Sequence, residues 1–188
     1  LVNWQASVND GLTPTSNIYN YQYHTDANGL VLDKILLPEY IDPAQTMRPA
    51  DTRWYDEISQ RAFLQSHNLT FTNGSEKGTM LLSLNYFDNN GIIEETEYKR
   101  YTARINSDYN FIGGKLKVGE NLAISKINNV EIPVNDVMYL ALVQQPVVPV
   151  HSIDGGWGGP APGMTDRHNP VRLIEDNKQN ISNSGRVF

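Results

Sequence analysis

The sequence lacks several features that would place it quickly in a class. It has no cysteine in 188 residues, which excludes a disulfide framework and thiolate metal sites. Its 15 Lys and Arg are outnumbered by 21 Asp and Glu, so the net charge is −6 and no basic surface for nucleic acid is expected. No run of about 18 apolar residues occurs, so no transmembrane helix is predicted. Barrel strands remain open, because each needs only about 9–11 residues of alternating polarity.

What the chain does contain is strict alternation, clearest in "YKRYTARINSDYN" at residues 98–110. One face of this predicted strand carries Tyr101, Ala103, Ile105 and Tyr109, and the other carries Arg100, Arg104, Asn106 and Asp108. A soluble sheet would turn the apolar face to a core, whereas a membrane barrel would turn it to lipid. The alternation alone fits both.

The lengths of the predicted connections favour the barrel. We predict four strands between residues 67 and 125, the second of which places Met80, Leu82 and Leu84 on its apolar side. The connections at 73–78 and 111–114 are short, and the others are longer. Alternate connections of a meander lie at the same end, so the short ones share one end. This sorting is typical of outer-membrane barrels.

The rest of the chain is predicted to be loop. We expect a long loop over 1–66 with a short helix at about 52–62, four strands over 67–125, a long loop with short helices over 126–181, and the start of another strand at 182–188. The first residue is not Met, and no signal peptide precedes the predicted elements. We therefore expect the chain to be part of a longer protein.

Several stretches together resemble the SusC/RagA family of TonB-dependent outer-membrane transporters. They are "DTRWYDEI" (51–58), the run from 67 to 111, "LKVGENLAIS" (116–125) and "NPVRLIEDNK" (169–178), in matching order and spacing. The resemblance implies an all-β fold: the N-terminal part of a 22-stranded antiparallel transmembrane β-barrel, with long, partly helical extracellular loops. It also implies the outer membrane of a Gram-negative bacterium as the location.

The same resemblance implies a function. Such proteins import oligosaccharides, glycans or peptides through a plugged barrel, powered by TonB, under a lid formed by a SusD-like lipoprotein. The plug and the TonB-binding segment would lie outside this chain, and no cofactor is implied. An alternative of another class is a soluble all-β carbohydrate-binding module, with Trp4, Trp54 and Trp157 as sugar platforms.

If the resemblance holds, each face of the sheet has its own surroundings. The lipid-facing residues would be Met80, Leu82, Leu84, Tyr101, Ala103, Ile105 and Tyr109, and the lumen-facing residues would be Arg100, Arg104, Asn106 and Asp108. Glu120 departs from the alternation, because it falls on the apolar side of its strand. Either the register shifts at Gly119, or Glu120 lies near the inner, periplasmic interface of the outer membrane.

Candidate contact residues gather in the long loop. We expect His151, Asp154, Trp157 and Arg167 to contact a ligand or the lid. His151, Asp154, Asp166 and His168 could in principle bind a metal, but their spacing matches no helical or finger pattern, so we interpret them as loop polarity. No nucleophile or carboxylate pair has a catalytic setting, so we do not expect an enzyme.

Overall fold

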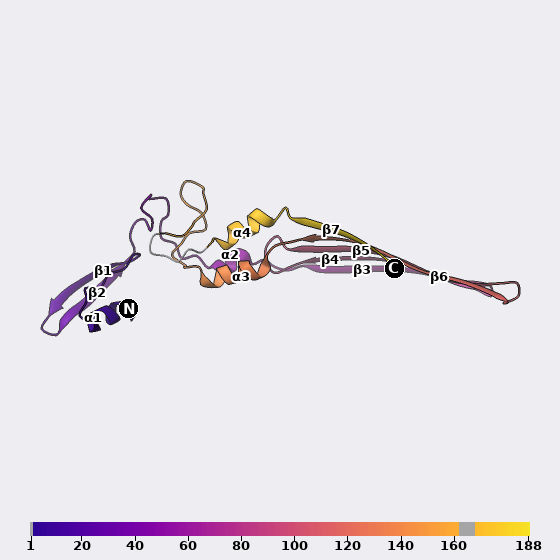
Figure 1. Ribbon diagram of the computed structural model, residues 1–188, viewed down its shortest axis with the longest axis horizontal. Helices are drawn as coiled ribbons and strands as arrows, with labels where there is room; N and C mark the ends of the chain where they lie inside the picture. Colours follow the sequence, from indigo (N-terminus) through magenta and orange to yellow (C-terminus); the bar gives the residue numbers. More distant parts are fainter. Residues whose placement is uncertain (1, 162–167) are drawn as a thin grey trace. The chain divides into compact units, whose positions relative to one another are not determined.

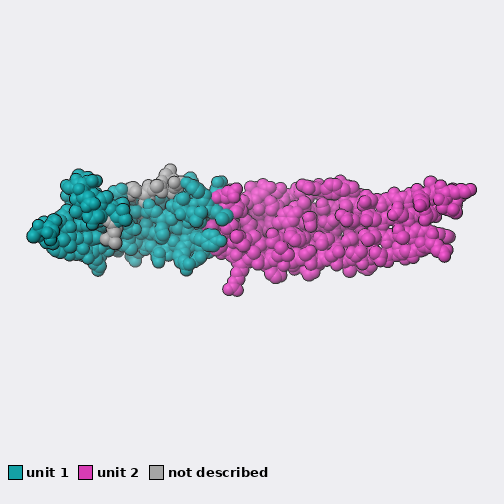
Figure 2. Space-filling view, turned by 90° about the horizontal axis from the view of Figure 1, so that it is seen from below, with its two compact units in different colours: residues 1–57, 136–172 teal, residues 58–135, 173–188 magenta. Residues whose placement is uncertain are grey.

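The computed structural model describes residues 2–161 and 168–188. The chain divides into two compact units, drawn in teal and magenta in Figure 2. Unit 1 consists of residues 1–57 and 136–172, and unit 2 of residues 58–135 and 173–188. Each unit therefore takes segments from two distant parts of the sequence.

Unit 2 is built on a five-stranded antiparallel sheet in the order β3-β4-β5-β6-β7 (Figure 1). The strands are β3 (Leu64–Ser75), β4 (Gly78–Asn90), β5 (Glu97–Phe111), β6 (Leu116–Val130) and β7 (Ile181–Val187). Spatial order equals sequence order, so the sheet is a meander of hairpins. The prediction of an all-β antiparallel fold is confirmed.

Two very short links join these strands at one end of the sheet. Only Glu76 and Lys77 separate β3 from β4, and residues 112–115 separate β5 from β6. The second link turns through three successive residues of positive φ, Ile112 (53°), Gly113 (63°) and Gly114 (85°). Two of the three are glycines, which adopt this conformation without a steric penalty. The longer links, 91–96 and 131–180, lie at the other end.

The strands extend further than the apolar alternation predicts. β3 begins at Leu64 instead of residue 67, and β6 continues to Val130 instead of ending at residue 125. The additional pairs are largely polar, such as Gln65 with Asp88. Main-chain hydrogen bonds hold these ends in the ladder, and a prediction based on hydrophobic period does not register them.

Unit 1 contains a hairpin where only a loop was predicted. Its elements are α1 (Val2–Asn9) and the antiparallel strands β1 (Asn20–Asp26) and β2 (Gly29–Leu36). The turn is set by Asp26, whose Oδ1 accepts a hydrogen bond from the Asn28 amide at 2.7 Å. Trp4 of α1 packs on Tyr21 and Tyr23 of β1, with ring centroids 5.2 and 5.1 Å away. The prediction of loop over 1–66 with a single helix is therefore wrong for these residues.

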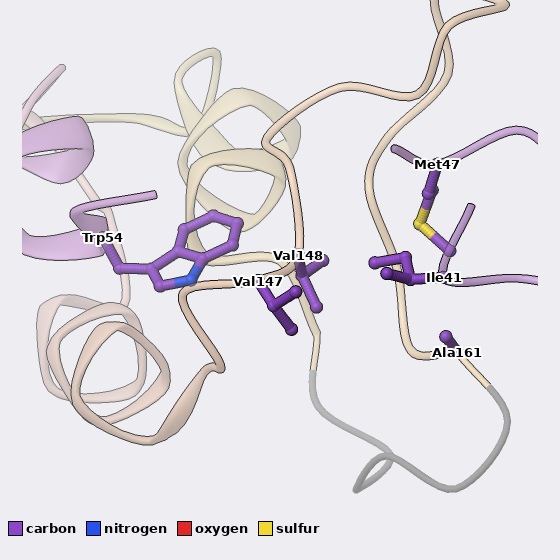
Figure 3. Close-up of a cluster of buried hydrophobic side chains, with 6 residues drawn as sticks. All are labelled: Ile41, Met47, Trp54, Val147, Val148 and Ala161. Atoms are coloured by element: carbon purple, nitrogen blue, oxygen red, sulfur yellow. The ribbon is translucent and has the colours of Figure 1, made fainter. Parts of the chain in front are cut away.

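A second cluster of unit 1 joins two segments that lie far apart in sequence. Figure 3 shows its buried side chains: Ile41, Met47, Trp54, Val147, Val148 and Ala161. Main-chain bonds reinforce it, from the Ala50 amide to the Val147 carbonyl (3.0 Å) and from the Thr52 amide to the Pro146 carbonyl (2.9 Å). The indole N–H of Trp54 also donates to the Gln145 carbonyl at 3.0 Å.

Three short helices complete the described structure. They are α2 (Trp54–Ile58), α3 (Val134–Val143) and α4 (Pro170–Asn177). Asn169 caps α4, since its Oδ1 accepts hydrogen bonds from the amides of Val171 (3.0 Å) and Arg172 (3.2 Å). Its amide nitrogen donates to the carbonyls of Val150 and Gly158, so one buried side chain fastens the helix start to the preceding loop.

Over residues 2–161 and 168–188, no helix is long and apolar enough to cross a membrane.

Candidate functional site

One face of the sheet in unit 2 is largely apolar, and one row that contains Asn73, Ser107 and Glu120 interrupts it. Strand register places Leu84 between Leu69 and Ala103, and Ala103 is paired in turn with Ile124. The adjacent row is Phe71, Leu82, Ile105 and Leu122. Seven residues predicted to share one face do share it: Met80, Leu82, Leu84, Tyr101, Ala103, Ile105 and Tyr109. Much of this surface is exposed in the described structure, including Leu84 at 43% and Phe71 at 55%.

The opposite face of the sheet is polar and carries the four residues predicted there. Along β5 these are Arg100, Arg104, Asn106 and Asp108, and their partners in register include Ser83 and Asn121. A groove of about 780 Å³ runs over this face, lined by Asn68, Asn85, Arg100, Arg104, Ser125 and Arg186 among others. The face therefore offers three guanidinium groups and several amides and hydroxyls to a polar or anionic partner.

Two groups on the polar face are held by close neighbours. The Arg100 guanidinium lies 5.6 Å from the ring centre of Phe87, within the range of a cation–π contact. Asp108 lies opposite Gly119, where a Cβ would meet the Asp108 carboxylate. The β5–β6 register runs unbroken through this point, so a shift at Gly119 does not explain the position of Glu120. Glu120 instead faces Ser107 on the apolar side of the sheet.

The apolar face ends in a band of polar and aromatic side chains at the end of the sheet away from the short links. His67, Tyr86, Tyr101 and Lys126 form one row across four strands. In the next row, Asp88 accepts hydrogen bonds from the Tyr86 hydroxyl (2.8 Å) and the Gln65 amide (3.1 Å). The Lys99 ammonium pairs with Glu97 at 2.7 Å. The apolar surface therefore has a defined boundary.

In the long loop, three of the four predicted contact residues lie in one small hairpin. His151 and Trp157 form an isolated antiparallel bridge, and their ring centroids are 4.6 Å apart. Asp154 sits at the tip, where its Oδ1 accepts hydrogen bonds from the Ser152 hydroxyl (2.6 Å) and the Gly156 amide (3.2 Å). These two bonds, the first the stronger, lower the pKa of Asp154. Arg167, the fourth predicted contact, lies outside the described residues.

A structured turn that the sequence interpretation missed supports this hairpin. Asp42 accepts hydrogen bonds from the Thr46 amide and hydroxyl and from the Met47 amide, at 2.7–3.1 Å. The Thr46 carbonyl then accepts the amide of Ile153 at 2.8 Å. Burial by itself would raise the pKa of Asp42, but the bonds from Thr46 and Met47 outweigh it and lower the pKa. The signal in the sequence was Asp42-Pro43 followed by Thr46, a turn pattern.

The histidines and acids considered as metal ligands are not gathered together. Asp166 lies outside the described residues, and His168 is exposed. Among the residues that are described, no group of three or more His, Asp or Glu is arranged to hold a metal ion.

The tryptophans of the alternative interpretation are mostly inaccessible. Trp4 is 4% exposed and Trp54 is 3% exposed, so neither can stack on a sugar. Trp157 is half-buried and one of its neighbours is the His151 ring. The predicted set of three sugar platforms is therefore wrong for Trp4 and Trp54, because both are packed into unit 1.

No model of a known protein family matches the chain. The TonB-dependent receptor SusC of Bacteroides thetaiotaomicron is 29% identical over 131 residues, which are 70% of this chain. A TonB-dependent receptor of Formosa agariphila is 34% identical over 74 residues, or 39% of the chain. The chain is homologous to SusC-type TonB-dependent receptors. It spans 12% of the length of SusC and 7% of the length of the Formosa receptor.

A solved structure agrees with the homology to SusC. The RagAB peptide importer in its "closed-closed" state matches 68% of this chain and 16% of its own, with a TM-score of 0.50 and 21% identity. At 21% identity this likeness concerns the fold alone, and it agrees with the antiparallel meander of this chain. The relatives are named as receptors and an importer, and none of these names describes an enzyme, in agreement with the prediction.

Proposed function

We propose that this chain forms part of a TonB-dependent importer of the SusC type, in the outer membrane of a Gram-negative bacterium. The importer would take up oligosaccharides, glycans or peptides through a plugged 22-stranded barrel, with a SusD-like lipoprotein as lid. The homology to SusC supports the class of transporter. The importer of known fold is named for peptides, so both ligand classes stay within the proposal.

The observation that carries the proposal is the height of the apolar band. On β5 the band runs from Tyr101 to Phe111, which is ten residue steps, and one row within it, with Ser107 and Glu120, is polar. At about 3.4 Å per step it spans about 34 Å along the strand. Strands of membrane barrels tilt by about 35–45°, which reduces this to about 24–28 Å along the membrane normal. The apolar band of known barrels is about 25 Å tall.

The polar face supports the same orientation. An arginine turned toward lipid at the bilayer midplane costs about 2–4 kcal/mol. Arg104 precedes Ile105 in sequence and lies near the middle of the band. The opposite orientation would place the charges of Arg100, Arg104 and Asp108 toward the hydrocarbon, whereas the proposed orientation places only that of Glu120 there among the residues of β5 and β6 inside the boundary rows of the band. We therefore assign Arg100, Arg104, Asn106 and Asp108 to the lumen and the apolar residues to lipid.

The loops at the far end from the short links would face outward. In the proposed orientation the links at 76–77 and 112–115 are periplasmic, and the hairpin at 151–157 is extracellular. His151, Asp154, Trp157 and Arg167 remain our candidates for contact with the ligand or the lid. The soluble carbohydrate-binding alternative is not favoured, since Trp4 and Trp54 are buried.

Single-cysteine labelling tests the orientation, because this chain contributes no cysteine of its own. Leu84→Cys and Ser83→Cys are adjacent positions on opposite faces. In the intact receptor in a bilayer, a spin label at 84 should be relaxed by oxygen, and a label at 83 by a water-soluble nickel chelate. Equal accessibility of both labels to the nickel chelate would refute the lipid-facing assignment.

Uptake by cells tests the transport function. Cells carrying the intact receptor should accumulate a labelled oligosaccharide or peptide ligand, and deletion of TonB should abolish the uptake. Trp157→Ala should weaken ligand capture, whereas Ile153→Ala, an exposed position in the same hairpin, serves as the matched control. Uptake that persists without TonB would contradict the proposal.

A further inference from the structure

The apolar face of the sheet is not uniformly flat. Ala103 lies between Leu84 on one neighbouring strand and Ile124 on the other, so a one-carbon side chain separates two long ones. The surface dips there, and the depression is bounded by Leu69, Tyr86 and Tyr101 as well. Its volume is about 520 Å³, and its walls are mainly apolar. A groove of this kind is suited to a hydrocarbon chain.

The outward end of this groove carries a cation. Lys126 lines the groove, follows Ile124 on the same face of β6 and is paired with Tyr101. Its side chain is exposed, and it forms no salt bridge within residues 2–161 and 168–188. Lys99, by contrast, is paired with Glu97. The charge available to an outside anion at this end is therefore that of Lys126.

Three aromatic rings lie at the same outward end of the groove, where a lipid headgroup would bind. His67 stacks on Tyr86 with ring centroids 6.2 Å apart, and Tyr86 lies 5.2 Å from Tyr101. Tyr86 is also fixed by its hydroxyl bond to Asp88. Tyrosines belong to the interface between hydrocarbon and water, with the ring in the apolar part. The apolar groove therefore ends, and Lys126 begins, at the depth where the acyl chain of a lipid meets its headgroup.

We propose that this groove binds one lipid that carries a phosphate group, with an acyl chain over Ala103 and the phosphate at Lys126. This rests on the proposed function, because the groove must face the outer leaflet. Contact with hydrocarbon alone gives little preference in a bilayer, where lipid tails surround every apolar surface. The selectivity comes from the paired features: a depression that accepts a chain and a cation at its outward end.

The test uses the intact receptor purified in detergent and native mass spectrometry with lipid A added as the probe. Dephosphorylated lipid A, which keeps the acyl chains, is the second probe. Wild type should retain lipid A more strongly than dephosphorylated lipid A. Lys126→Ala should reduce the retention of lipid A about fivefold, which is the effect of one lysine near an anionic headgroup. Lys117→Ala, on the opposite face of the same strand, is the matched control and should change nothing.

Filling the groove tests the other half of the proposal. Ala103→Leu should reduce retention of both lipid A and its dephosphorylated form, while Ala123→Leu on the opposite face should not. Folding of every variant is checked by heat-modifiable mobility on gels. Unchanged lipid A retention in Lys126→Ala or Ala103→Leu would overturn the proposal. So would inorganic phosphate that displaces lipid A at equal concentration, which would indicate a simple anion site.

Failure of the lipid-binding proposal can be distinguished from failure of the proposed function. If the label at position 84 reports lipid and no selective retention of lipid A occurs, only the lipid site is refuted. If that label reports water, the orientation fails and the lipid site fails with it.

Discussion

Leu81 and Leu82 form a natural pair for testing which face of the sheet meets lipid. The two leucines are adjacent on β4 and point to opposite faces. Leu82 pairs with Phe71 and Ile105 on the apolar face, whereas Leu81 pairs with Thr72 and Asn106 on the polar face. Replacing either residue with arginine is the same chemical change, so the difference between the variants isolates the surroundings of each face.

The expected magnitude follows from the depth of Leu82. Its partner Ile105 lies four steps from Tyr101 and six from Phe111, so the row is near the middle of the apolar band. An arginine facing lipid near the midplane costs about 2–4 kcal/mol. This corresponds to a roughly 30- to 1000-fold loss in the folding equilibrium. Leu81→Arg should cost much less, because its guanidinium would stay hydrated beside Asn106 and Asn121.

The assay is the amount of folded receptor in the outer membrane, measured by heat-modifiable mobility after extraction. The free energy of folding into lipid vesicles, measured by urea titration, gives the quantitative comparison. Leu82→Arg should assemble poorly and Leu81→Arg nearly as well as wild type. Equal losses in the two variants, or a larger loss for Leu81→Arg, would refute the assignment of the apolar face to lipid.

Two further predictions concern single positions. Gly119→Ala should destabilise the β5–β6 hairpin by about 1 kcal/mol, the lower end of the cost of overpacking. Its Cβ would lie 3.2 Å from the Ser107 carbonyl and would meet the exposed Asp108 carboxylate, which can rotate away. Thermal melting should show partial rescue by Asp108→Ala, and a wild-type melting temperature in the single variant would contradict this packing. Asp42 has a lowered pKa, so its stabilisation of the 42–47 turn is present above its ordinary value of 3.8 and is lost as the pH falls through the lower folded value. Protease sensitivity of unit 1 should therefore rise at acid pH in wild type, whereas Asp42→Ala should be sensitive already at neutral pH and should lack the acid step.

The sheet could be predicted from the sequence where one face is apolar. Along β4 and β5 the alternation is strict, and side chains of a strand point to opposite faces in turn. Leu84 and Ala103 therefore had to share a face if the strands paired in register, and they do. The solvent on each face could not be predicted in this way, because a soluble sheet and a barrel use the same alternation.

The elements that were missed depend on main-chain pairing, on one aromatic contact and on local hydrogen bonds. The β1–β2 hairpin is held by main-chain pairing and by the packing of Trp4, which lies outside both strands. The outer ends of β3 and β4 persist through polar pairs such as Gln65 with Asp88. The Asp42 turn is a set of local hydrogen bonds to one carboxylate. A method based on hydrophobic period has no signal for any of these contacts.

The free edge of β3 adds a requirement that the two faces alone do not impose. β3 has 12 residues and pairs with β4 on one side, and no described strand lies on its other side. In water such an edge promotes association, whereas in hydrocarbon each unpaired amide or carbonyl costs several kcal/mol. If the apolar face meets lipid, as the band height favours, the edge groups of β3 must be paired by another strand of the receptor. If the labelling test shows that Leu84 faces lipid, the β3 edge must therefore be paired with another strand, because an open edge is incompatible with a position in hydrocarbon.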